Sequence, residues 1–151
     1  MKLFIFPSLN ITNIWAGVGA GKWAVAEPSD PAQMKGLKTK SLGMPVGSAG
    51  VIYRTGPLDG FFTTPFIVYS SPDQNDPETQ VWDGTWVLPF RIHPLGTPRK
   101  RLTKHRAEQT LPILKSRPQT NITSVLNLTH YFVPSEVSER DWEVLLEHLA
   151  E

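Results

Sequence analysis

Residues 13–25, NIWAGVGAGKWAV, place three glycines and a lysine between two tryptophans, a composition typical of phosphate-binding loops. A Walker loop requires a glycine four spacers before Gly-Lys and a hydroxyl residue after it, but Ala16 and Trp23 occupy these positions. A dinucleotide fingerprint also fails, because Lys22 stands where a third small residue is needed. We therefore expect no nucleotide site here, and predict a glycine-rich loop that separates Trp15 from Trp23.

The remaining polar residues form no catalytic or metal-binding pattern. Paired carboxylates can act as acid and base, but those in the expected loops have no histidine or serine at motif spacing: Asp59, Asp73, Asp76 and Glu78. The sequence Gly47-Ser-Ala-Gly50 lacks the spacing of a nucleophile elbow. The chain has no cysteine, and its four histidines lack zinc-ligand spacing. We predict that the protein is not an enzyme and uses neither a metal ion nor a cofactor.

Length and composition predict one domain over residues 1–151. A hydrophobic fraction of 40% and a charged fraction of 19% are typical of a globular protein. The 14 prolines and 11 glycines favour strands and loops over long helices. The N-terminal apolar run is too short for a signal peptide, and no run is long enough to cross a bilayer. We expect a soluble, cytoplasmic protein without a membrane partner.

Apolar runs bounded by proline and glycine predict strands. These runs are residues 2–6, 50–54, 60–70, a strand that follows the turn-like Asp83-Gly84 and ends at 92, and 124–134. The two halves of residues 81–95 around that turn are a candidate hairpin. Pro65 makes the third run an edge strand or a bulge. Residues 27–43 are polar and predict a surface excursion with one helical turn. Ser138 and Asp141 resemble a capping box that opens a helix to Ala150, so the chain as a whole has an α+β or small-barrel pattern.

Three stretches in order resemble the EVE domain, a relative of the YTH reader domain in the PUA-like superfamily. Trp15-Ala-Gly17-Val18 is similar to a Trp-x-Gly-Val segment. Met44-Pro-Val46-Gly47 with Tyr53 is similar to a Met-x-Val-Gly…Tyr signature, and residues 126–146 to a terminal strand, Pro-Val turn and helix. Val81-Trp82 resembles the point where YTH domains place a cage tryptophan. The resemblance implies a PUA-like mixed sheet or pseudo-barrel with a few short helices and a C-terminal helix.

The resemblance also implies a reader of a modified base, such as 5-methylcytosine or N6-methyladenine, in DNA or RNA. Two facing indoles can stack on both faces of an extruded base. We predict that Trp15 and Trp82 form this aromatic cage, with core packing as the alternative. Trp86 either closes the cage floor or packs in the core, whereas Trp23 and Trp142 are predicted to be core residues.

The resemblance also implies that polar residues near the first turn bond the edge of the base, because they lie where YTH-like readers use polar side chains. Asn10, Ser8 and Asn13 can supply donors and acceptors, although turn capping is an equally simple role for them. Tyr53 can hydrogen-bond inside the pocket, but a strand tyrosine held in the core is the simpler interpretation.

The segment TPRKRLTKHR concentrates one third of the chain's lysines and arginines. Its basic residues are Arg99, Lys100, Arg101, Lys104 and Arg106. Such a cluster favours phosphate contacts, although many charge runs are only solvated loops. We call residues 99–106 the basic segment and expect it to hold the nucleic-acid backbone.

Two other functions remain open at this stage. The tryptophans would also suit a small-molecule or nucleotide-binding protein, or a protein-interaction module with an exposed aromatic patch. The resemblance further implies that a nuclease is a possible working partner, since related domains occur beside nucleases. The sequence itself carries no nuclease module.

Overall fold

The computed structural model describes residues 1–56, 60–117 and 121–151, so Asp59 lies outside the described residues. The strands are β1 (Lys2–Ser8), β2 (Lys22–Ala26), β3 (Ala49–Arg54), β4 (Phe61–Val68), β5 (Trp86–Pro94), β6 (Arg101–Thr103) and β7 (Pro134–Glu136). The helices are α1 (Ile11–Ala20), α2 (Pro31–Ser41), α3 (Lys104–Thr110), α4 (Pro112–Lys115), α5 (Ile122–Val125) and α6 (Glu139–Leu149).

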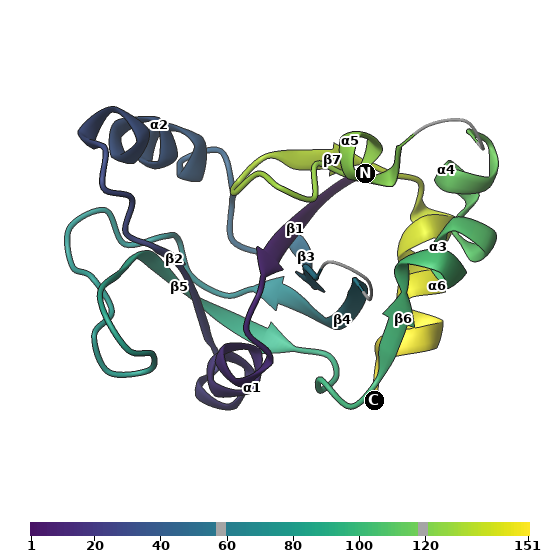
Figure 1. The fold of residues 1–151 in the computed structure, drawn as a ribbon, viewed down its shortest axis with the longest axis horizontal. Helices are drawn as coiled ribbons and strands as arrows, with labels where there is room; N and C mark the ends of the chain where they lie inside the picture. Colours follow the sequence, from purple (N-terminus) through teal and green to yellow (C-terminus); the bar gives the residue numbers. More distant parts are fainter. Residues whose placement is uncertain (57–59, 118–120) are drawn as a thin grey trace.

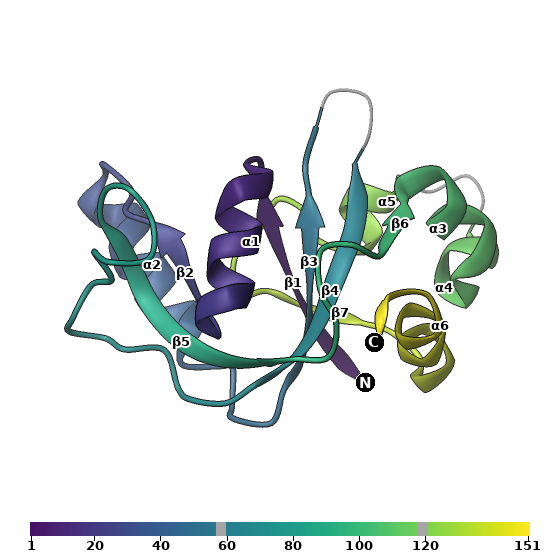
Figure 2. The ribbon, with the colours of Figure 1, turned by 90° about the horizontal axis from the view of Figure 1, so that it is seen from below.

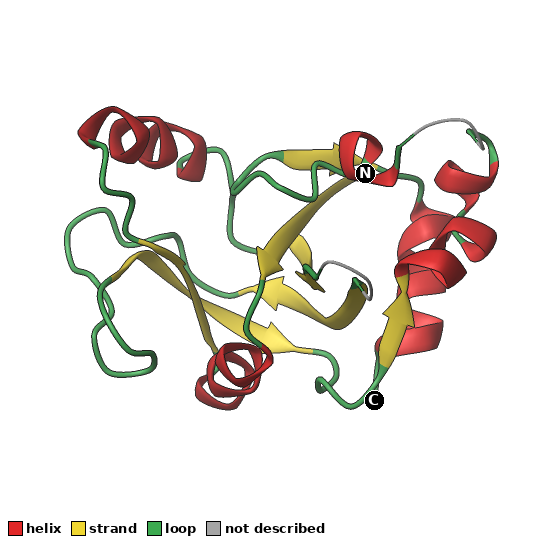
Figure 3. Cartoon of the chain, viewed as in Figure 1, coloured by secondary structure: helices red, strands yellow, loops and turns green. Residues whose placement is uncertain are grey.

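In the described part of the chain, seven strands form a single curled sheet (Figures 1 and 3). Its order is β2-β5-β4-β3-β1-β7, and β6 pairs with the first half of β4. β1 and β3 run parallel, whereas the other pairs are antiparallel. The mixed sheet with short helices and a C-terminal helix confirms the predicted α+β class.

Two hydrophobic layers lie on opposite faces of the sheet, because successive strand side chains alternate. In β1, Leu3 and Ile5 join a core beneath α3, α4 and α6. Phe4 and Phe6 join a second core, which α1 and α2 cover. Figures 1 and 2 show α1 and α2 well separated from the α3, α4 and α6 group. Each face of the sheet therefore has its own core and its own covering helices.

Pro65 lies at a bulge inside the sheet and not on an edge strand. β4 is flanked by β3 and β5, and its register with β3 shifts between the Val51 and Ile52 pairs. Thr64 is the extra residue, with φ of 44°. A bulge tolerates proline because a ladder hydrogen bond is already missing there. The bulge prediction is confirmed, and the edge alternative is wrong.

The predicted glycine-rich loop is largely a helix, α1, followed directly by strand β2. Asn10 caps the helix start, since its side chain accepts hydrogen bonds from the backbone N–H groups of Thr12 and Asn13. Gly21 ends it in the left-handed conformation, with φ of 66°. The loop prediction was wrong because cap residues and packing outweigh the low helix propensity of glycine.

Two other segments differ from prediction. Residues 27–43 contain the eleven-residue helix α2, which Asp30 caps and Pro31 opens. Residues 124–134 were predicted as a strand, but only 134–136 pair in the sheet, as β7. Asn127 and Phe132 have positive φ values of 51° and 61°, which an extended strand excludes.

The C-terminal helix confirms its prediction. α6 begins after Ser138, whose side chain and that of Asp141 form the reciprocal bonds of a capping box. Val144, Leu145 and Leu149 are buried against the sheet. Trp142 is half-buried and packs against the same core.

Candidate functional site

A pocket of about 210 Å³ opens where the end of β1 meets the start of α1. β2 forms its floor and the segment 78–86 one wall; we call this segment the tryptophan loop and the cavity the tryptophan pocket. Its lining residues are Pro7, Ser8, Leu9, Asn10, Asn13, Trp23, Ala24, Val25, Ala26, Trp82, Trp86 and Tyr131. Aromatic side chains and amides therefore converge on one small cavity.

The aromatic wall consists of three indoles, of which Trp82 contacts the other two. Trp82 lies between the other two, with its ring centroid 5.2 Å from that of Trp86 and 5.8 Å from that of Trp23. The rings are inclined by 43° and 81°. A base sandwiched between two rings would need two contacts of about 3.5–4.0 Å, or about 7 Å in all. A base therefore does not fit between Trp82 and either of its two neighbours.

Hydrogen bonds hold the tryptophan loop closed. The backbone groups of Glu78 and Trp86 bond reciprocally, at 2.7 and 3.1 Å. The Glu78 carboxylate accepts hydrogen bonds from the backbone N–H groups of Gln80 and Val81, at 2.7 and 3.2 Å. Lys22 Nζ on β2 donates to the same carboxylate at 3.0 Å. The loop is thus a closed turn tied to β2, and an isolated bridge between Glu78 and Trp86 stands in place of the candidate hairpin of residues 81–95.

The charge of Glu78 is stabilised where it lies. Its side chain is only 7% exposed, yet the N–H of Gln80 and the Lys22 ammonium keep the pKa of its carboxyl below the usual range. A carboxylate held in this way remains ionised at neutral pH and is unsuited to act as a general acid. Its role is to hold the loop that carries Trp82 and Trp86.

Two indole N–H groups are anchored, and one is not. Trp82 Nε1 donates to the backbone oxygen of Asn13 on α1, at 2.9 Å. Trp86 Nε1 donates to the backbone oxygen of Asp83, also at 2.9 Å. Trp23 Nε1 is buried and has no partner among the described residues, which costs about 1–3 kcal/mol. Trp82 is therefore locked to α1 across the pocket.

The polar wall comes from the β1–α1 junction, as predicted for Ser8, Asn10 and Asn13. Asn10 Oδ1 serves as the helix cap, which is the capping role considered in the sequence. Ser8 Oγ donates to the Asn10 backbone oxygen at 3.4 Å. In residues 1–56, 60–117 and 121–151, no acceptor pairs with the Nδ2 group of either asparagine. Two amide donors thus remain available beside the indoles.

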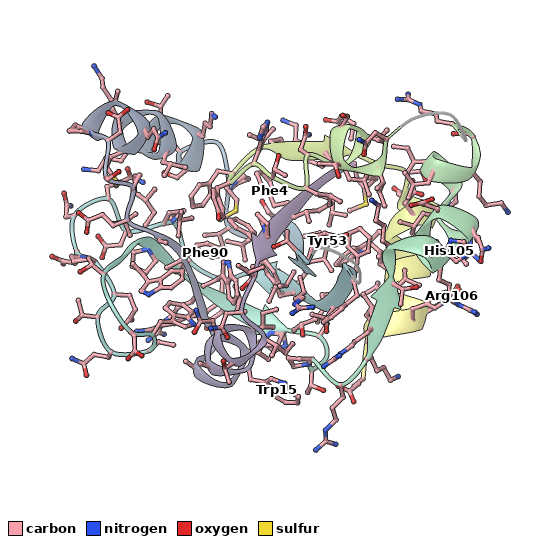
Figure 4. The ribbon with its side chains drawn as sticks, in the orientation of Figure 1. Phe4, Trp15, Tyr53, Phe90, His105 and Arg106 are labelled. Atoms are coloured by element: carbon pink, nitrogen blue, oxygen red, sulfur yellow. The ribbon has the colours of Figure 1, made fainter. Side chains whose placement is uncertain are left out.

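Trp15 does not line the tryptophan pocket. It is 43% exposed, and Figure 4 shows it at the outer side of α1. A helix completes one turn in about 3.6 residues, so two residues span about 200°. Trp15 therefore projects from nearly the opposite side of α1 to Asn13. The structure therefore does not bring Trp15 and Trp82 together as a facing pair, and the indoles that line the pocket are Trp23, Trp82 and Trp86. The loop prediction for residues 13–25 was the source of this difference.

Tyr53 also lies outside the pocket, because successive side chains of its strand point to opposite faces of the sheet. On β3 it shares the core of Phe62, 4.8 Å between ring centroids, on the sheet face opposite the indoles. Burial raises the pKa of its phenol. The core interpretation of Tyr53 is the one that agrees with the structure.

The basic segment lies beside α6, at the other end of the molecule from α2 (Figures 1 and 4). None of its residues lines the tryptophan pocket. Lys100 Nζ donates to the backbone oxygen of Ala150, and the Arg101 guanidinium lies 4.5 Å from the ring centre of Phe61. Arg99, Lys104 and Arg106 are exposed. The structure therefore brings the indoles and amides together, but not the basic segment.

Sequence reasoning missed Trp23 and Tyr131 as pocket residues. The side chain of Trp23 is only 3% exposed and still lines the cavity. Trp23 is therefore both a core residue and a pocket residue. The available signal was the position of Asn10, Asn13 and Gly17 on one face of a helix. Recognising that helix leaves Trp23 on the strand that follows it. Tyr131 lies in the segment predicted to be a strand, where its orientation could not be derived.

Among the described loop carboxylates, no hydrogen bond joins the side chains of Asp73, Asp76 and Glu78 to one another. Asp73 accepts from the backbone N–H groups of Asp76 and Asn75, which lower the pKa of its carboxyl. Among the described residues, no group of three or more histidine, aspartate or glutamate side chains is placed to hold a metal ion. Within the same residues, no helix has the length and apolarity that crossing a membrane requires.

Solved structures with the same fold are YTH domains. The chain is similar to the YTH domain of Zygosaccharomyces rouxii MRB1 in complex with N6-methyladenosine RNA, with TM-score 0.60, 14% identity, and 97% and 86% of the two chains covered. It is similar to the Pho92 YTH domain in complex with m6A, with TM-score 0.62, 12% identity and 99% and 84% covered. The Mmi1 YTH domain in complex with RNA gives TM-score 0.58, 11% identity and 97% and 77% covered.

No family profile matches the sequence, and no curated protein matches it. The shared feature is therefore the fold, an α+β YTH-like architecture.

Proposed function

We propose that this chain is a non-catalytic reader that takes a modified base of RNA into the tryptophan pocket. The observation that carries the proposal is the convergence on one cavity of three indoles and of two asparagine Nδ2 groups that have no acceptor among the described residues. The fold adds support, since similar structures bind N6-methyladenosine RNA or m6A. The Trp-x-Gly-Val and Met-x-Val-Gly segments further favour the EVE branch of such readers.

The size and chemistry of the pocket suit one base. A cavity of about 210 Å³ is below the about 300–1,000 Å³ of typical small-molecule sites. Trp86 is half-buried, the most accessible of the three indoles, and offers a face for stacking worth about 1–3 kcal/mol. Asn10 and Asn13 offer amide donors to the edge of the base. An added methyl group gains about 0.8 kcal/mol when apolar walls bury it.

A base reaches such a pocket only when it leaves its stack. Single-stranded RNA presents unstacked bases, whereas extrusion from a duplex costs a few kcal/mol. The indoles are held before binding, since Trp82 is bonded to α1 and Glu78 closes the loop. The binding energy is therefore not consumed in ordering the pocket.

The test compares two tryptophan variants in calorimetric titrations with N6-methyladenosine, 5-methylcytidine and their unmodified nucleosides, and with short single-stranded RNA and DNA that carry the modified base. Trp86→Ala should weaken binding of the preferred modified nucleoside by about 5- to 150-fold, the equivalent of one lost stacking contact. Trp15→Ala is the matched control, because Trp15 is exposed outside the pocket, and it should leave the affinity unchanged. Circular dichroism checks that both variants are folded.

The outcomes separate this proposal from its rivals. Equal loss in both variants would exclude the tryptophan pocket as the binding site. Tight binding of free nucleotides without a gain from RNA would favour a small-molecule-binding protein. Absence of any nucleoside or oligonucleotide binding would favour a protein-interaction module. Preference for modified DNA over RNA would change the polymer but keep the pocket.

A further inference from the structure

Strand β6 leaves one edge of the sheet open. Among the described strands it pairs only with β4, where it lies opposite Phe61–Thr63. Antiparallel partners alternate between hydrogen-bonded and non-bonded pairs, and the N–H of Lys104 donates to the Gly60 oxygen at 2.9 Å. The N–H groups of Arg101 and Thr103 and the C=O of Arg101 therefore point away from β4. No group of the described residues bonds to these three, and we call this side of β6 the open edge.

The residues on and beside the open edge are cationic. Four of them are exposed: Arg99, Arg101, Lys104 and Arg106. Among the described residues, none of the four forms a salt bridge with a carboxylate. The Glu151 carboxylate interacts with Arg99 but is already bonded to the N–H of Thr97, at 2.7 Å. A negatively charged strand is therefore attracted to this edge.

These charges select the kind of strand that can pair with β6. Two copies of the open edge would place like charges side by side, which is how many edge strands avoid pairing with their own kind. A strand with carboxylates at alternate residues would instead place opposite charges across the ladder from Arg101, since alternate side chains share one face. The edge therefore disfavours a second copy of itself and favours an acidic partner.

A polypeptide suits the open edge better than RNA. The ring of Phe61 is only 6% exposed, and the Arg101 guanidinium lies 4.5 Å from its centre, so it offers no free face on which a base can stack. Phosphate oxygens only accept hydrogen bonds. An extended peptide supplies acceptors for the two N–H groups and also a donor for the Arg101 carbonyl.

We infer that the open edge of β6 binds an extended acidic segment of a partner protein, which adds to the sheet as a further strand. The backbone bonds hold the segment, and the basic segment selects its charge. The inference is independent of the proposed function, because no residue of the basic segment lines the tryptophan pocket.

The experiment measures the affinity, by fluorescence anisotropy, for a labelled short peptide in which glutamate and threonine alternate. Arg101→Gln should weaken binding about 2- to 5-fold, the effect of one exposed ion pair. Arg91→Gln is the matched control, because it removes an exposed arginine from β5 outside the basic segment, and it should leave the affinity unchanged. The same peptide N-methylated at every residue keeps its charge but has no backbone donors, and it should bind about tenfold more weakly or less well still.

Amide hydrogen exchange followed by NMR locates the contact. The N–H groups of Arg101 and Thr103 should exchange more slowly when the peptide is bound, because new hydrogen bonds protect them. The N–H of Leu102 already faces β4 and should change least. Absence of binding, equal binding of the N-methylated peptide, or unchanged exchange at Arg101 and Thr103 overturns the inference. Tighter binding of a single-stranded RNA at this edge also overturns it and returns the basic segment to nucleic acid.

Discussion

Two glycines of α1 provide a sharp test of how the tryptophan pocket is built. Gly17 is buried, and a Cβ placed there would lie 2.7 Å from Trp23 Cε3 and 2.9 Å from the Lys22 backbone oxygen. Gly19 is exposed, and a Cβ there would meet no atom within 4 Å. Both occupy the same helix, so an alanine at either site brings the same change in helix propensity.

The expected effects have opposite signs. Alanine in place of glycine stabilises a helix by about 1 kcal/mol, which is the whole effect for Gly19→Ala. At Gly17 the overpacking costs about 1–3 kcal/mol, because Trp23 is a rigid buried ring and Lys22 contributes backbone. Gly17→Ala should therefore be destabilised by about 1 kcal/mol overall. For a chain of this length, each kcal/mol shifts the Tm by about 2–4 °C.

Thermal unfolding followed by circular dichroism measures both variants, and nucleoside titration measures the pocket. Gly17→Ala should melt below the wild type and bind the modified nucleoside more weakly, because Trp23 must move. Gly19→Ala should melt above the wild type and bind equally well. A Gly17→Ala variant as stable as Gly19→Ala would refute the close contact between α1 and Trp23.

Two further predictions concern buried carboxylates. The lowered pKa of Glu78 stabilises the fold above its unfolded-state pKa of about 4.3, and this stabilisation disappears as pH falls through the folded-state pKa. In urea unfolding at pH 7, the free energy of unfolding of Glu78→Gln should therefore be about 1–3 kcal/mol lower than that of the wild type. This difference should narrow below pH of about 4, and a difference that is independent of pH would contradict this reasoning. Asp141 is 1% exposed and accepts from the backbone N–H groups of Ile113 and Ser138, at 2.9 and 2.8 Å. Asp141→Asn should cost about 1–3 kcal/mol, against less than about 1 kcal/mol for the exposed Glu143→Gln on the same helix.

The elements that follow from local rules were predictable from the sequence. β1, β3 and β4 are apolar runs between proline and glycine, and their existence needed no tertiary information. The start of α6 was visible in Ser138 and Asp141, since the capping box acts within four residues. The bulge at Pro65 followed from the missing N–H of proline.

The elements that depend on distant contacts were not predictable. α1 contains three glycines within its last turns and at its end, and it persists because Asn10 caps it and its apolar residues pack on the sheet. The segment 124–134 has the composition of a strand, but positive φ at Asn127 and Phe132 turns it away from the ladder. Asparagine adopts positive φ more readily than most residues, but the type of Phe132 gives no indication of its backbone angle.

The candidate site shows the same division. The resemblance to YTH-like readers and the residue types together selected five residues that lie around one pocket in the structure: Ser8, Asn10, Asn13, Trp82 and Trp86. The role of Trp15 depended on residues 13–25 being a loop, and the helix moved that indole to the outside. Recognising the helix would have selected Trp23 in its place. The direction of a side chain thus required the correct element, while its chemistry did not.

The alternation along β1 has a consequence for how this sequence can diverge. Each successive residue from Leu3 to Phe6 serves a different layer, so the strand specifies an order of apolar positions but not particular side chains. Hydrophobic substitutions that conserve volume are tolerated in such layers. A single inserted or deleted residue would instead exchange the two layers at every later position. Homologous chains can therefore lose nearly all identity in this strand and still fold alike, provided that its length is unchanged.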